Sequence, residues 1–181
     1  FNVISGIHEP EVGEVCFEGE TLAGVLSRRR IEKGLSRSFQ NIRLMPHLSV
    51  LENVMLGQHS RFGFFDKMKP LQFFSKATGK DEAIETLSSF GIDLHKGQTV
   101  SSLPYGVRKK IEVVRALMAG PRLLLLDEPA AGLNTMETNT LRDFLLDVSD
   151  RGITLLLVEH DMPFVNSLCE HVSVMNFGQL I

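Results

Sequence analysis

The sequence predicts an α/β protein built on a parallel sheet with a helical insert, and three features of the chain carry that prediction. Apolar runs at 123–126 and 153–158 have the length and leucine content of strands buried on both faces. A predicted helix follows each run, and such alternation indicates parallel strands joined by right-handed crossovers. The stretch from about 49 to 110 shows helical patterns and no buried strand, which is typical of an insert.

The composition is that of a globular protein. Hydrophobic residues make up 43% and charged residues 23% of the 181 residues, and the net charge of −3 offers no electrostatic basis for binding nucleic acid. We interpret the basic clusters at 28–30 and 108–110 as solvated helix faces. Cys16 and Cys169 lie far apart, which indicates a reducing compartment without a disulfide or metal framework. No apolar run approaches the ~18 residues that a membrane helix needs.

The elements before the insert are short. Residues 1–5 are expected to form a helix that Gly6 closes. The stretch 13–19 alternates weakly between two glycines and predicts a strand, and 35–40 predicts a second one.

The insert begins with a helix signal. Ser49 and Glu52 match a capping box, so a helix should start there and run to about Gly57. Residues 60–80 mix Phe, Lys and Gly without clear periodicity, and we expect a loop with irregular helix. Apolar residues at helical spacing predict a further helix over 81–90.

The last part of the chain alternates helices and strands. A helix should follow 103–106 and stop at the Gly-Pro pair 120–121. Asn134 should open the next helix and Asp161 the one after it, and 171–181 contains a last strand. The residues expected on the inner faces of the first two helices are Ile111, Val114, Leu117, Leu141, Phe144, Leu145 and Val148.

Two adjacent carboxylates stand where the first buried strand ends. Ligands of open α/β sheets bind beyond the carboxyl ends of the strands, so Asp127 and Glu128 suit a Mg²⁺ ion and a water to be activated. Asp-Glu-Pro is also a good strand exit, and these three residues alone do not decide between the two interpretations.

Two further polar residues end predicted strands. His160 follows the second buried strand, where it serves either as a structural hydrogen-bonding residue or as a sensor of a phosphate. Gln40 ends an earlier strand just before the insert, and its amide is either a polar edge or a ligand of Mg²⁺ that couples the site to the insert.

The order of these motifs resembles one family. Phe39-Gln40, LPYG at 103–106, LLLLDEPAAGLN at 123–134 and LLLVEHD at 155–161 are similar to the nucleotide-binding subunits of ATP-binding-cassette (ABC) transporters. The resemblance covers essentially the whole chain and is strongest to the ATPase subunits of branched-chain amino acid importers. It implies a RecA-like P-loop nucleotide-hydrolase core with a helical subdomain.

The resemblance also implies roles for single residues. Gln40 matches the Q-loop glutamine, Asp127 the Walker B aspartate and Glu128 the catalytic glutamate, while His160 matches the switch histidine. The implied reaction is ATP hydrolysis, with Mg²⁺ held by Asp127 and Gln40, water oriented or deprotonated by Glu128, and the γ-phosphate sensed by His160. The other positions expected to contact nucleotide are Leu103, Pro104, Tyr105, Gly106 and Asn134.

The sequence departs from the family pattern at two places. It contains no glycine-rich loop ending in Gly-Lys-Ser/Thr, so we expect a partial domain that lacks the first strands and the phosphate loop. Within 1–181, the helical subdomain at about 49–110 would separate core segments 1–48 and 111–181. Residues 103–107 match the signature motif of the family, and Val107 replaces a glutamine in it. This replacement either weakens dimerisation or has no consequence because the side chain packs harmlessly.

The resemblance implies partners as well. A second ABC ATPase subunit, identical or related, would complete two ATP sites, and transmembrane permease subunits would hold the pair at the cytoplasmic face of the membrane. A solute-binding protein would act indirectly, and no nucleic acid is expected. The alternatives are another ABC system such as lipopolysaccharide export, a chromosome-maintenance ATPase, which would need a coiled coil that is not evident, and a non-catalytic fragment. For the 181 residues alone we expect no ATPase activity and an exposed apolar edge at 153–158.

Overall fold

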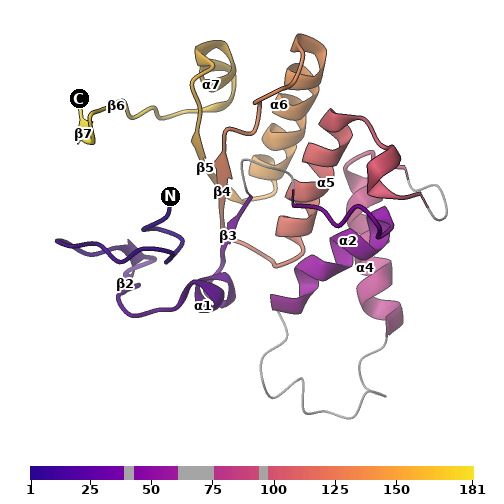
Figure 1. Cartoon of the computed structure of the whole chain (residues 1–181), viewed down its shortest axis with the longest axis horizontal. Coiled ribbons are helices and arrows are strands. Elements are labelled where there is room, and N and C mark those ends of the chain that lie inside the picture. The colour runs from indigo at the N-terminus through magenta and orange to yellow at the C-terminus, as the bar shows by residue number, and fades with distance from the viewer. Residues whose placement is uncertain (39–42, 61–75, 94–97) are drawn as a thin grey trace.

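A computed structural model describes residues 1–38, 43–60, 76–93 and 98–181 of the chain. Its centre is a parallel three-stranded sheet in the order β3 (Leu35–Arg37), β4 (Leu123–Asp127) and β5 (Thr154–Val158) (Figure 1). The register pairs Leu35 with Leu123 and Asp127 with Val158. The predicted α/β class and parallel sheet are therefore confirmed.

The two apolar runs differ in burial. In the central strand β4, Leu124, Leu125 and Leu126 are at most 1% exposed, as expected. The prediction of full burial is wrong for β5, where Leu156 is 39% and Val158 49% exposed. Strand β5 lies at the sheet edge, and only its alternate face, with residues such as Leu157, packs against the core.

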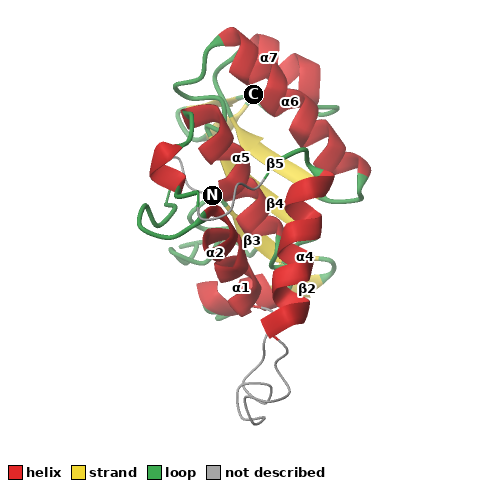
Figure 2. Cartoon of the chain, turned by 90° about the vertical axis from the view of Figure 1, so that its right-hand side faces the viewer, coloured by secondary structure: helices red, strands yellow, loops and turns green. Residues whose placement is uncertain are grey.

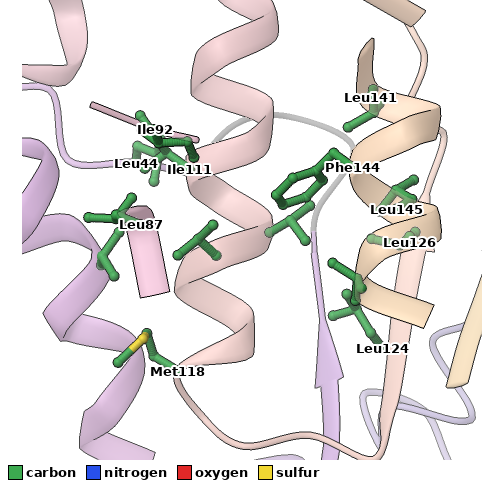
Figure 3. Close-up of a cluster of buried hydrophobic side chains, with 14 of the residues drawn as sticks. Leu44, Leu87, Ile92, Ile111, Met118, Leu124, Leu126, Leu141, Phe144 and Leu145 are labelled. Atoms are coloured by element: carbon green, nitrogen blue, oxygen red, sulfur yellow. The ribbon is translucent and has the colours of Figure 1, made fainter. Parts of the chain in front are cut away.

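Two long helices cover one side of the sheet. Helices α5 (Tyr105–Leu117) and α6 (Thr135–Asp150) lie on the same side of β4 and β5 (Figures 1 and 2). Figure 3 shows side chains of α5, α6 and β4 pointing toward one another, with Phe144 between the two helices. The expected inner residues of α5 and α6 are buried, except that Leu117 is only partly covered.

The middle of the chain is helical, as expected. Helix α2 (Val50–Met55) starts at Ser49, whose capping box with Glu52 is complete, and continues as the 3₁₀ helix η1 (Leu56–Ser60). Gly57 is required here because a Cβ at this position would lie 1.9 Å from the Arg115 carbonyl oxygen of α5.

Helix α4 (Lys76–Ser89) starts before the predicted position at residue 81, and the short η3 (Val100–Ser102) precedes α5. The segment 61–75, which covers most of the predicted irregular loop, lies outside the described residues. Buried side chains of this region, such as Val54 and Leu87, join the same hydrophobic cluster as Leu124 of the sheet. The helical elements are thus packed continuously onto the core.

The beginning of the chain folds differently from the prediction. Residues 1–5 form a hydrogen-bonded turn and not a helix, with a bond from the Ser5 N–H to the Phe1 carbonyl of 2.8 Å. The strand predicted over 13–19 is shorter: β1 (Cys16–Phe17) pairs with β2 (Glu20–Thr21) in an antiparallel hairpin.

Helix α1 (Ser27–Glu32) carries the first basic cluster, and the prediction of a solvated face is wrong for Arg30. Its side chain is only 2% exposed because its guanidinium ties the N-terminal turn to α1. The guanidinium donates hydrogen bonds to the backbone carbonyls of Val3, Ile4, Leu22 and Val25.

The C-terminal part ends in a small hairpin. Helix α7 (Met162–Leu168) is capped by Asp161, which accepts a hydrogen bond from the Phe164 N–H, as predicted. The single last strand of the prediction is instead a pair of short strands, β6 (Met175–Asn176) and β7 (Gln179–Leu180). Within the described ranges, no helix combines the length and the apolar composition needed to cross a bilayer.

Candidate functional site

Asp127 stands at the carboxyl end of β4 and forms an ion pair with Arg37 of β3. Arg37 Nη2 lies 2.9 Å from Asp127 Oδ2, and the two side chains are 15% and 25% exposed. Arg37 Nη1 also donates to Asn2 Oδ1 at 2.8 Å and to Ser5 Oγ at 3.1 Å. The resemblance implies that Asp127 holds Mg²⁺, and in this structure Asp127 also has a positive partner within the chain, Arg37.

Glu128 occupies a backbone conformation that is rare for its residue type. Its φ of +45° is left-handed, and its N–H donates to the Val158 carbonyl of β5 at 2.9 Å. Such strain costs about 1–3 kcal/mol and tends to persist at functional sites. The loop that leaves β4 is therefore held against the end of β5, with the Glu128 side chain 31% exposed.

His160 lies beside Glu128, as the prediction of a shared site requires. Its Nδ1 is 4.0 Å from Glu128 Oε1, and the imidazole is 77% exposed. Since Asp127 pairs with Val158 in the sheet, Asp127, Glu128 and His160 all lie at one edge, beyond the carboxyl ends of β4 and β5. The structure thus brings together three of the four residues predicted for catalysis and metal binding, and the fourth, Gln40, lies outside the described residues.

Two buried charges complete this edge, and sequence reasoning missed both. The side chain of Glu159 is 1% exposed, and its two oxygens accept the N–H groups of Ala130 and His160. Lys109 of α5 is 4% exposed, so the prediction of a solvated face for the second basic cluster is wrong. Helix α5 packs against α2, α6 and β3, which leaves this part of it little solvent.

The environment of Lys109 is acidic and partly dry. Burial lowers the pKa of the Lys109 ammonium, while the nearby carboxylates of Glu112, Glu159 and Glu128 act in the opposite direction. The Tyr105 ring adds a cation–π contact, with its centroid 5.7 Å from Lys109 Nζ. Lys109 is therefore the positive charge that faces the carboxylates of the site from α5.

The LPYG motif lies next to the turn that follows β4. Pro104 precedes the first residue of α5, and a Cβ at Gly132 would lie 3.5 Å from the Tyr105 ring. A Cβ at Gly106 would lie 3.1 Å from Glu137 Oε1 of α6. Gly106 therefore permits a close approach to Glu137, whereas the φ of +78° at Gly132 is a left-handed conformation that favours glycine.

The other predicted nucleotide contacts are placed as follows. The side chain of Asn134 caps α6 by accepting the Glu137 N–H at 3.0 Å. Leu103 and Val107 are partly buried against the core cluster, which favours the interpretation that Val107 packs harmlessly.

The oxygen ligands at the carboxyl end of β4 fit a magnesium ion that keeps most of its waters. Arg37 bonds Oδ2 of Asp127, and none of the residues that the structure describes donates to Oδ1, which leaves that oxygen for a hydrated ion. Among the same residues, no three or more His, Cys, Asp or Glu side chains form a group that could hold a metal ion together. One carboxylate that shares an ion with phosphate oxygens and waters is a typical arrangement for Mg²⁺.

Replacing Arg37 with Met should lower the free energy of unfolding by about 1–2 kcal/mol, because Asp127 loses its partner and the N-terminal turn loses two hydrogen bonds. Urea denaturation of the purified protein measures the change. Arg142→Met is the matched control, since Arg142 pairs with Asp143 on the surface of α6 and should change stability by less than about 0.5 kcal/mol. Equal effects of the two substitutions would contradict the prediction.

The arrangement of sheet, helices and strand-end carboxylates is that of an ATP-binding cassette. A crystal structure of a nucleotide-free ATP-binding cassette from an ABC transporter matches with a TM-score of 0.84 and 26% identity, over 99% of this chain and 72% of that one. The ADP conformation of MJ1267, an ATP-binding cassette of an ABC transporter, matches with a TM-score of 0.85 and the same identity and coverage. The RecA-like cassette fold is therefore confirmed.

The sequence comparisons identify the family. Residues 1–131 match the ABC transporter family. The chain is 33% identical to the high-affinity branched-chain amino acid transport ATP-binding protein BraF of Pseudomonas aeruginosa, over 98% of this chain and 72% of BraF. It is 32% identical, with the same two coverages, to LivG of Escherichia coli K12, which carries the same description. This chain belongs to the ABC transporter family.

Proposed function

We propose that this chain is the ATP-binding and ATP-hydrolysing part of an importer for branched-chain amino acids. The observation that carries the proposal is the identity to BraF and LivG, which extends over 98% of the chain. The meeting of Asp127, Glu128 and His160 at one sheet edge supports it, because hydrolysis needs these groups within reach of one phosphate.

The proposed chemistry relies on positioning and charge. Asp127 and Gln40 would hold Mg²⁺, which would supply positive charge to the phosphates of ATP. Glu128 orients the attacking water or accepts its proton, and His160, 4.0 Å away, contacts the γ-phosphate. Phosphoryl transfer to water in this way needs no covalent intermediate on the protein.

The proposed assembly is a pair of ATPase subunits under a membrane permease. Leu103–Gly106 at the start of α5 and Asn134 at the start of α6 would meet the nucleotide held by the second subunit. The helical subdomain at about 49–110 would transmit closure of the pair to the permease, with core segments 1–48 and 111–181 forming the rest of the domain. In this arrangement the protein would lie at the cytoplasmic face of the membrane, and a solute-binding protein would act indirectly.

The alternatives differ in solute and in activity. A lipopolysaccharide-export ATPase would share the layout, but its signature motif would be LSGG, and this chain has LPYG at 103–106. A non-catalytic role would leave transport dependent on the presence of the protein and independent of Glu128.

Uptake of labelled amino acids tests the proposal. In cells that lack the gene, import of leucine, isoleucine and valine should fall, and the wild-type gene in its full length should restore it. Glu128→Gln should not restore import, whereas restoration by this variant would support the non-catalytic alternative. Unchanged import of all three amino acids in the deletion strain would refute the assigned solute.

A further inference from the structure

Glu159 is a buried carboxylate that the proposed reaction does not use. Its side chain is 1% exposed, although glutamate is almost never fully buried without partners. It is the residue directly after β5, while the neighbouring strand β4 ends one position before Glu128. Glu159 therefore lies between the loops that leave two adjacent parallel strands.

The carboxylate of Glu159 joins these two loops. Oε1 accepts the Ala130 N–H at 2.8 Å, and Oε2 accepts the His160 N–H at 3.1 Å. Hydrogen bonds to an ionised acceptor are roughly twice as strong as neutral ones. One side chain thus fixes the backbone of the turn after β4 and the backbone of the residue proposed to contact phosphate.

The residues that the structure describes constrain the His160 side chain only weakly. Its imidazole is 77% exposed, and the carboxylate oxygens nearest to Nδ1 are Glu159 Oε2 at 3.9 Å and Glu128 Oε1 at 4.0 Å. Since an exposed side chain changes rotamer readily, the backbone of His160 largely determines where the ring can reach. The bond from its N–H to Glu159 is therefore a main determinant of its placement.

The turn after β4 is bound by the same carboxylate. Ala130 is 8% exposed, and its turn continues to Gly132, which lies against the Tyr105 ring of α5. Lys109 of α5 contributes favourable electrostatics to the buried Glu159 charge. The carboxylate thus receives hydrogen bonds from two loops and positive charge from a helix.

We propose that Glu159 is a positioning residue that holds His160 and the turn beginning at Ala130 in one arrangement, so that the two move together. The effect on turnover rests on the ATP hydrolysis proposed above, whereas the hydrogen bonds can be tested without it. The loss of His160 placement should lower kcat and leave the binding of ATP nearly unchanged.

Two substitutions in the full-length gene product test this proposal. Glu159→Ala removes both acceptors, and Glu159→Gln keeps one acceptor oxygen, so it should give an intermediate effect. Hydrogen exchange followed by NMR, without nucleotide, should be about tenfold faster at the Ala130 and His160 amides in Glu159→Ala, while the amides of 124–126 in β4 stay protected. In ATPase assays, kcat should fall about tenfold and KM should change less than about twofold.

Glu170→Gln is the matched control, because Glu170 is an exposed glutamate that follows α7, at the other end of that helix from Glu159, and should leave both amides and kcat unchanged. Unchanged exchange at both amides overturns the proposal, as does faster exchange that extends through β4, which would indicate general destabilisation. Released amides with an unchanged kcat would also overturn the positioning role. If the wild-type protein does not hydrolyse ATP, the proposed function fails, while the exchange data still decide whether Glu159 holds the two loops.

Discussion

Replacing Glu128 with Gln in the full-length gene product should abolish ATP turnover and leave ATP binding intact. The substitution keeps the size of the side chain and its ability to accept a hydrogen bond, but the neutral amide cannot take a proton from water. Loss of a general base typically lowers rates by about 10²–10⁴-fold. The left-handed backbone at position 128 is as accessible to Gln as to Glu, so the fold of the loop should be preserved.

Steady-state phosphate release and equilibrium binding of a fluorescent ATP analogue measure the two halves of this prediction. Glu85→Gln is a suitable control, because Glu85 is exposed on α4, which is distant in sequence from the carboxyl end of β4. It should retain full turnover. Turnover above about one tenth of wild type in Glu128→Gln would contradict the role assigned to Glu128. A loss of ATP binding would indicate that the substitution damages the structure of the site.

Replacing Lys109 with Met should lower the free energy of unfolding by about 2–3 kcal/mol. Met has a similar length and fills the space among the helices, but it removes the ammonium that faces Glu112, Glu159 and Glu128. The side chain of Glu112 is only 2% exposed and that of Glu159 1%, so these carboxylates cannot gain much hydration in compensation. Removing one partner of a buried charge cluster typically costs about 3–5 kcal/mol. The variant no longer carries the desolvation penalty of the buried Lys109 ammonium, which offsets part of that cost.

Lys110→Met provides the matched comparison for Lys109 within the same helix. The Lys110 ammonium lies 5.7 Å from the Phe144 ring centroid, and burial lowers the pKa of Lys110 as it does for Lys109. Among the residues that the structure describes, however, the charge that opposes this effect is that of Asp143. We expect a loss of less than about 1 kcal/mol for Lys110→Met. Chemical denaturation at neutral pH measures both variants, and a smaller effect for Lys109 than for Lys110 would refute the charge cluster.

Local patterns in the sequence predicted most of the helices and the central strand. The apolar spacing of Leu141, Phe144 and Leu145 predicts the buried face of α6, because helical neighbours are three or four residues apart in the chain. The capping box at Ser49 likewise involves only residues that are close in sequence. The prediction of a helix at residues 1–5 fails because a single turn of backbone hydrogen bonds offsets little of the cost of starting a helix. A five-residue sequence therefore does not distinguish a turn from a helix.

For the site, local sequence is enough to find the polar residues that follow the strands, since Asp127, Glu128 and His160 stand where apolar runs end. Their partners depend on how distant parts of the chain pack together. Arg37 reaches Asp127 across 90 positions of the chain, and Glu159 binds Ala130 across 29. Lys109 and Arg30 belong to basic clusters for which the sequence predicts solvated helix faces. Their burial likewise depends on elements that are distant in the chain. A charged side chain is buried when groups elsewhere in the chain replace its water, and no local pattern records where those groups will lie.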